Sequence, residues 1–259
     1  MKFNTKCVHG SGRPDSTGAI SPAIYMSSTF SHPKLGDTTG YQYTRESNPT
    51  RDRLEQLIAG LEDGKDALAF SSGMAAVDAV FHLFSPGDHI ILGDDLYGGS
   101  IRMFTNIYEQ NGIEFTYVGT SDLDAVKAAF KPNTKAVYIE TPTNPMMEIT
   151  DIRALCALAH ERNALVIIDN TFLSPYFQKP LTLGADIVVH SGTKFIGGHH
   201  DVISGFTIVN DEELAAKLRL TYKTVGACLS AMDSWLVIRG VKTLALRMEQ
   251  HQKNAIALA

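Results

Sequence analysis

The sequence predicts an α/β protein built on a mostly parallel sheet. After residue 60, short runs rich in aliphatic and β-branched residues alternate with longer amphipathic runs, the pattern of strand and helix in such folds. Hydrophobic residues make up 44% of the 259, with 21 Gly and 10 Pro, so the chain can bury a core. The formal net charge of -5 does not fit the clustered basic surface of a nucleic-acid-binding protein.

We expect seven strands, each a short apolar run bounded by turn residues. Their ranges are 67–70, 89–92, 115–118, 136–140, 165–169, 187–190 and 205–209. Amphipathic runs between or after them predict helices over 74–83, 101–110, 123–130, 152–162 and 212–222. The alternating order requires crossover connections, which join parallel strands. A mostly parallel seven-stranded sheet between helices is the expected fold.

The two ends of the chain differ from this middle. Residues 1–50 are rich in Gly, Ser and Pro, which predicts an extended N-terminal arm held by the rest of the fold or by a partner subunit. Residues 51–240 form the expected main domain. An amphipathic helix begins near Val241 and reaches Ala259 without a stop signal, so we expect 241–259 to be the start of a helix that leads into a further domain.

Several site classes are not indicated. Three widely spaced cysteines, Cys7, Cys156 and Cys228, give neither a disulfide framework nor a zinc pattern. The adjacent residues of His199-His200-Asp201 do not point at one ion, so no metal site is predicted. No apolar run is long enough for a bilayer, and no apolar signal follows Met1. We expect a cytoplasmic protein without membrane or nucleic-acid partners.

Ligands collect beyond the carboxyl ends of parallel strands, so the residues there are the candidates. The first strand is followed by Ser72-Gly73-Met74, which opens a helix whose N–H groups suit a phosphate; taken alone, a plain glycine turn with a serine cap is the better explanation. Asn144 lies in a rigid Thr-Pro-Thr-Asn-Pro turn, either as a ligand amide or as a turn former. Asp169 ends an apolar strand and needs a cation, a capping role or a structural salt bridge.

Basic and aromatic residues complete the candidates. Lys194, in Ser191-Gly192-Thr193-Lys194, fits a partly desolvated amine that attacks a carbonyl, or an ordinary surface lysine. Tyr97 could stack on a planar ring, and Tyr43 with Arg45 could clamp a phosphate, although surface packing accounts for either. Pyridoxal 5′-phosphate (PLP) needs a lysine, a carboxylate for its ring nitrogen, a stacking ring and a phosphate cup. The set therefore predicts PLP as the cofactor.

With these motifs in this order, the chain resembles the PLP-dependent trans-sulfuration enzymes of cysteine and methionine metabolism over essentially its whole length. The resemblance implies a large PLP-binding domain of the aspartate-aminotransferase-like type. It implies that Lys194 forms the Schiff base and moves protons, and that Asp169 pairs with the pyridinium nitrogen. Tyr97 would stack on the ring and help to deprotonate the incoming amine.

The resemblance also assigns the remaining cofactor contacts. Gly73 and Met74 would give N–H groups to the phosphate, and Asn144 would bond the phenolic oxygen of the ring. The hydroxyls of Ser191 and Thr193 would also reach the phosphate. Tyr43 and Arg45 would reach the phosphate of a neighbouring subunit, which implies a homo-oligomer, at least a dimer and usually a tetramer.

The implied reaction is cleavage or γ-replacement at a C–S bond of a sulfur-containing amino acid, as in cystathionine γ-synthases and γ-lyases. Methionine γ-lyases carry a cysteine two residues after the stacking tyrosine, and Gly99 stands there. The alternatives are a cystathionine β-lyase, an O-acetylhomoserine sulfhydrylase, or a truncated PLP-binding chain without full activity. Family members continue into a C-terminal domain that carries the arginine for the substrate carboxylate, and we expect this chain to lack it.

Overall fold

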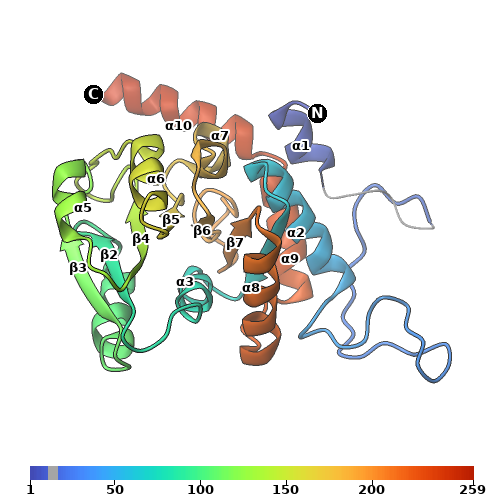
Figure 1. Ribbon diagram of the computed structural model, residues 1–259. Helices are drawn as coiled ribbons and strands as arrows, with labels where there is room; N and C mark the ends of the chain where they lie inside the picture. Colours follow the sequence, from blue (N-terminus) through green and yellow to red (C-terminus); the bar gives the residue numbers. More distant parts are fainter. Residues whose placement is uncertain (11–16) are drawn as a thin grey trace.

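The computed structural model describes residues 1–10 and 17–259, and a seven-stranded sheet forms its centre (Figure 1). The strands lie in the order β1-β7-β6-β5-β4-β2-β3. Their bounds are β1 (Asp66–Phe70), β2 (His89–Gly93), β3 (Glu114–Val118), β4 (Thr134–Glu140), β5 (Leu165–Asp169), β6 (Ile187–Ser191) and β7 (Gly205–Val209). Each lies within two residues of its predicted range. Strands β2 to β6 pair in parallel and β7 pairs antiparallel with β1 and β6, which confirms a mostly parallel α/β sheet.

The five predicted helices are present with shifted ends. They are α3 (Gly73–Phe81), α4 (Gly98–Met103) with a π-helical turn (Phe104–Tyr108), α5 (Leu123–Ala129), α6 (Ile152–His160) and α8 (Glu212–Val225). The sequence analysis missed α1 (Phe3–His9), α2 (Pro49–Glu62), α7 (Ser174–Phe177) and α9 (Ala231–Val241). The helix expected from Val241 is wrong at its start, because α9 ends there and α10 (Leu244–Leu258) begins after a turn.

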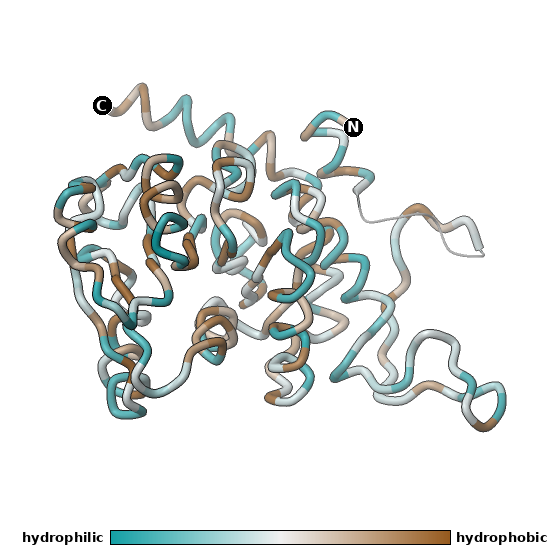
Figure 2. Tube along the Cα trace, viewed as in Figure 1, coloured by the Kyte–Doolittle hydropathy of each residue, from teal (hydrophilic) through white to brown (hydrophobic). Residues whose placement is uncertain are grey.

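Helices cover both faces of the sheet, because alternate strand residues point to opposite sides. On one face α3, the π-helical turn and α8 bury a cluster that includes Leu68, Phe70 and Tyr138. On the other face α2 and α9 cover Ala67 and Ala69, and α5 and α6 cover further strands of the sheet. Figure 2 shows α3 as hydrophobic along much of its length, in keeping with its place in this core.

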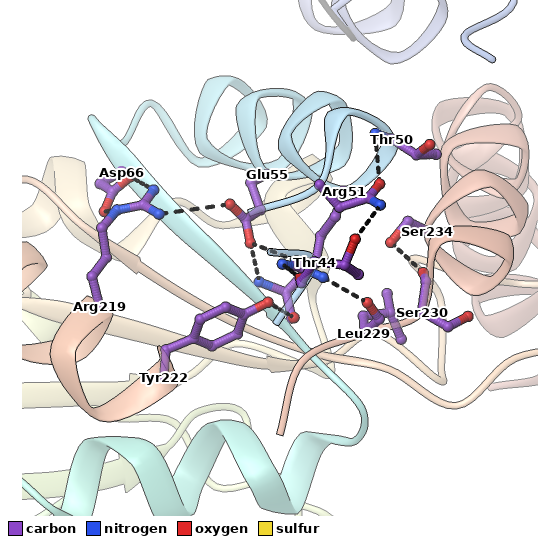
Figure 3. Close-up of polar contacts among 12 residues, drawn as sticks. Thr44, Thr50, Arg51, Glu55, Asp66, Arg219, Tyr222, Leu229, Ser230 and Ser234 are labelled. Atoms are coloured by element: carbon purple, nitrogen blue, oxygen red, sulfur yellow. Dashed lines mark hydrogen bonds and ion pairs between the residues drawn. The ribbon is translucent and has the colours of Figure 1, made fainter. Parts of the chain in front are cut away.

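A buried arginine ties the end of the N-terminal arm to the main domain (Figure 3). The Arg51 side chain is fully buried, and it donates from Nη2 to Thr44 O at 2.5 Å and from Nη1 to Leu229 O at 3.2 Å. Its guanidinium lies 5.5 Å from the centre of the Tyr222 ring, and Glu55 on the next turn of α2 accepts from Ala69 N at 3.0 Å. These contacts join the arm, α2, β1, α8 and the segment before α9. Residues 17–47 of the arm extend away from the sheet on the α2 side (Figure 1), whereas α1 packs against α2 and α10.

Among the described residues, no helix combines the length and the apolar character needed to cross a membrane.

Candidate cofactor site

One cavity of about 1160 Å³ opens at the carboxyl edge of the central strands. It is bounded by the residues that follow β1, β2, β4, β5 and β6, and by α10. Eight of the predicted site residues line it, namely Gly73, Met74, Tyr97, Asn144, Asp169, Ser191, Thr193 and Lys194. Residues more than a hundred positions apart in the sequence therefore face one space.

The first turn of α3 offers free N–H groups to this cavity. The Ser72 side chain caps the helix by accepting from Ala75 N at 3.1 Å, whereas Gly73 N and Met74 N have no acceptor among the residues that the structure describes. A Cβ on Gly73 would lie 2.8 Å from Ser191 Cβ, so only glycine allows α3 to begin so close to the end of β6. Free N–H groups at the positive end of a helix dipole form an anion site.

The two hydroxyls after β6 differ in their bonding. Thr193 Oγ1 donates to Ser204 O at 3.2 Å and accepts from Ser204 N at 3.1 Å, so it fixes the turn to the loop before β7. Ser191 N donates to Thr171 Oγ1 at 2.8 Å, and no hydrogen bond of Ser191 Oγ is found within the described ranges. The Ser191 hydroxyl is thus the freer of the two.

Asp169 stands at the end of β5 with its carboxyl group at the cavity. Its Oδ1 accepts from Thr171 N at 3.0 Å, and burial raises the pKa of this carboxyl above its ordinary value. No Lys or Arg forms an ion pair with it in residues 1–10 and 17–259, so the structural salt bridge weighed from the sequence is not found. A half-buried carboxyl without a Lys or Arg partner favours a cation supplied by a ligand.

Glu140 is a cavity residue that the sequence analysis did not single out. It is 6% exposed, it ends β4, and it pairs in register with Asp169 of β5. Burial, reinforced by the negative charge of Asp169, raises the pKa of Glu140 to about 8. The signal was available, because an acid at the end of an apolar strand had already drawn attention to Asp169.

Tyr97 precedes α4, with its side chain 53% exposed at the cavity. Its N–H donates to Glu140 Oε2 at 3.2 Å, which ties the tyrosine to β4. A Cβ on Gly99 would lie 2.3 Å from the Tyr97 ring, so this glycine makes room for the ring. Asn144 is exposed on the cavity wall, in the turn before α6.

Lys194 lies in a turn after β6, with its backbone N–H directed to Ser191 O at 3.3 Å. The residue is exposed and lines the cavity. The partial desolvation expected from its sequence neighbours is therefore wrong for this structure, since Phe195 packs against the core cluster under α9 and α10 instead. The lysine is accessible to any ligand that enters the cavity.

Tyr43 and Arg45 are not brought to the cavity of their own chain. The Arg45 guanidinium lies 5.2 Å from the centre of the Tyr43 ring and donates to Lys223 O at the end of α8. Both residues are exposed. Within the described ranges, no group of three or more His, Cys, Asp or Glu side chains could hold a metal ion.

Comparison with known proteins identifies the family. The sequence model of the family described as "Cys/Met metabolism PLP-dependent enzyme" matches residues 4–259. Cystathionine γ-lyase of Bacillus subtilis (strain 168) is 50% identical over 260 residues, covering 100% of this chain and 69% of the relative. Cystathionine β-lyase of Lactococcus lactis subsp. cremoris (strain MG1363) is 50% identical over 258 residues, covering 99% of this chain and 68% of the relative.

A solved structure gives the same answer. The crystal structure of cystathionine γ-lyase from Lactobacillus plantarum, complexed with L-serine, superposes with a TM-score of 0.97 at 50% sequence identity. The match covers 100% of this chain and 68% of that one. The chain therefore belongs to the PLP-dependent enzymes of cysteine and methionine metabolism.

Proposed function

We propose that the chain binds PLP in the cavity at the carboxyl edge of the sheet and uses it to break or replace a C–S bond of a sulfur-containing amino acid. The proposal is carried by one observation: an exposed lysine, a half-buried carboxyl without a Lys or Arg partner, and a helix N-terminus with free N–H groups line the same cavity. Lys194, Asp169 and Gly73 supply these three features. PLP presents an aldehyde, a basic ring nitrogen and a phosphate, which match them one by one.

The hydrogen-bonding groups, charge and aromatic ring of the cavity residues match the phosphate, nitrogen and ring of PLP. The N–H groups of Gly73 and Met74 lack acceptors in the described chain, and a phosphate would supply them. Asp169 carries a carboxyl whose pKa burial raises, and a protonated ring nitrogen beside it would favour its charged form. The Tyr97 ring, held by Glu140 and given room by Gly99, offers a face on which the cofactor ring stacks.

When bound, PLP supplies an electron sink for the negative charge that develops on the substrate Cα. The Nζ of Lys194 would take the proton from the substrate Cα and pass it to a neighbouring atom, because Lys194 is an exposed amine that lines the cavity. The Tyr97 hydroxyl would accept a proton from the substrate amine. Asn144 would orient the cofactor ring through its side-chain amide.

We assign γ-chemistry, of the cystathionine γ-lyase or γ-synthase kind, as the first reading. Gly99 in place of a cysteine disfavours methionine γ-lyase chemistry. The γ-lyase and β-lyase relatives are equally similar to this chain at 50% identity, so β-elimination is the second reading and O-acetylhomoserine sulfhydrylation the third. A γ-reaction requires further proton transfers by Lys194 at Cβ, whereas β-elimination requires only the transfer of the Cα proton.

A homo-oligomer, a dimer or a tetramer, is part of the proposal. Tyr43 and Arg45 lie exposed on the arm, away from the cavity of their own chain, as residues that serve a neighbouring copy would. A cytoplasmic location also stays a prediction.

The test is a product assay on the purified chain loaded with PLP. Cystathionine should yield 2-oxobutyrate if γ-elimination occurs and pyruvate if β-elimination occurs; O-acetylhomoserine with sulfide tests replacement. Lys194→Ala is the matched control and should abolish every product. Product formation by Lys194→Ala at the rate of the unaltered chain would contradict the assignment.

A further inference from the structure

The turn that carries Lys194 is held mostly by glycines and backbone bonds. Gly198 N donates to Lys194 O and Gly197 N to Gly192 O, both at 2.8 Å. Gly198 has φ +71°, which favours glycine. Thr193 ties the start of the turn to the loop before β7 and Ile196 is buried in the core, while the backbone between them, which carries Lys194 and Phe195, depends on what packs against it.

Arg247 of α10 is the side chain that packs there. Its Nη1 donates to Phe195 O at 2.6 Å, in the residue next to Lys194. Its Nη2 donates to Gly240 O at 3.0 Å, and its Nε donates to Thr243 Oγ1 at 3.1 Å. One guanidinium thus joins the lysine turn to the end of α9 and the start of α10.

Two glycines make room for this junction. A Cβ on Gly198 would lie 2.2 Å from Arg247 Nη1, and a Cβ on Gly240 would lie 2.2 Å from Gly197 O. The turn and the helices therefore meet backbone to backbone, with the guanidinium inserted between them. Small shifts of α10 would be passed to the turn through these contacts.

The bonding of Arg247 differs from that of an arginine in a structural ion pair. Arg247 forms no ion pair in the described part of the chain, and burial lowers the pKa of its guanidinium. Its side chain lines the cavity together with Lys194. Arg219 of α8, by contrast, forms hydrogen bonds and an ion pair with Asp66 and a second ion pair with Glu55. The planar guanidinium of Arg247 donates to two carbonyl oxygens in fixed directions and so fixes the position of one backbone segment relative to the other. The single ammonium group of a lysine does not do this.

We propose that Arg247 is a positioning residue for Lys194: it fixes the 194–198 turn to the α9–α10 junction so that the amine faces the cavity. The inference rests on the proposed function, in which Lys194 carries the cofactor. Loss of the guanidinium frees Phe195 O and loosens the turn, and misplacement of a reacting group by about 1 Å can cost a hundredfold in rate.

The experiment compares Arg247→Met and Arg247→Lys with Arg219→Met, which removes an exposed arginine that does not line the cavity. Hydrogen exchange of the cofactor-free chains is read on the peptide over residues 192–200. Arg247→Met should exchange there about tenfold faster, the loss expected for one charged hydrogen bond. Arg247→Lys should lie between it and the unaltered chain, and Arg219→Met should leave this peptide unchanged.

The second readout is the rate at which added PLP becomes covalently attached to Lys194, followed by absorbance and by borohydride trapping. Arg247→Met should slow attachment at least tenfold with part of the rate restored in Arg247→Lys. Unchanged exchange in Arg247→Met overturns the inference, and faster exchange with an unchanged attachment rate does so too, because the role is then structural only. If PLP does not attach to Lys194 in the unaltered chain, both the inference on Arg247 and the proposed function are wrong. The other outcomes contradict only the inference on Arg247.

Discussion

Glu140 gives the sharpest prediction about the cavity in the absence of cofactor. Burial and the neighbouring charge of Asp169 raise the pKa of Glu140 to about 8, against the opposing effect of the Tyr97 N–H bond. The native chain therefore holds a proton that the unfolded chain releases near 4.5. The stability this provides is fully present below the unfolded pKa and is lost as the pH rises through the folded pKa.

The size of the effect follows from the two pKa values. Between about pH 5 and about pH 8.5 this group should remove about 4 kcal/mol from the free energy of unfolding, an upper bound set by the shift. Glu140→Gln cannot ionise and keeps an oxygen acceptor for Tyr97 N. Its free energy of unfolding, relative to the unaltered chain, should rise by that amount across the same range.

Urea unfolding of both cofactor-free chains, followed by circular dichroism at matched salt, measures this difference. Glu114→Gln is the matched control, because Glu114 is exposed and its ion pair with Lys131 lowers its pKa. The stability from Glu114 is present above the unfolded pKa and lost in acid, so its variant should show no gain toward alkaline pH. If the difference in free energy of unfolding between Glu140→Gln and the unaltered chain stays constant from acid to alkaline pH, the pKa of Glu140 is not raised in the folded chain.

Three further changes test the cofactor site. Gly205→Ala would place a Cβ 2.1 Å from Ser72 O, so it should lower the free energy of unfolding by about 1–3 kcal/mol and weaken PLP binding. Gly60→Ala, in open space on α2, should raise the free energy of unfolding by about 0.5–1 kcal/mol. Denaturant midpoints in the reverse order would contradict this. Asp169→Asn should weaken PLP binding at least tenfold by equilibrium dialysis, because an amide cannot pair with a cation, and unchanged affinity would count against the pairing. Arg45→Ala should speed PLP loss on gel filtration while leaving the melting temperature of the cofactor-free chain nearly unchanged, because Arg45 is exposed; equal retention would argue against a clamp on a neighbouring copy.

The strands and most of the cavity could be predicted from the sequence because both depend on local pattern. Apolar runs ending in Asp169 or Ser191 mark strand ends, and parallel strands bring such ends to one edge. The antiparallel placement of β7 between β1 and β6 could not be predicted in this way, since its pairing with β1 joins segments more than a hundred residues apart.

Helix α2 shows why part of the fold was missed. Asn48 caps it by accepting from Thr50 N at 2.9 Å, and Pro49 stands at its first position, which are ordinary start signals. Yet the helix buries Arg51, Glu55 and Glu62 with its leucines, so its apolar stripe is interrupted by charge. Burial of these groups is stabilised by partners elsewhere in the chain, which no local pattern reveals.

The lysine to which the cofactor is attached can be identified directly by chemical trapping. The chain is loaded with PLP, reduced with borohydride, digested and mapped by mass spectrometry. We expect the reduced cofactor on Lys194 alone, and none bound after reduction in Lys194→Ala. Label on another lysine, or equal label in Lys194→Ala, would contradict it.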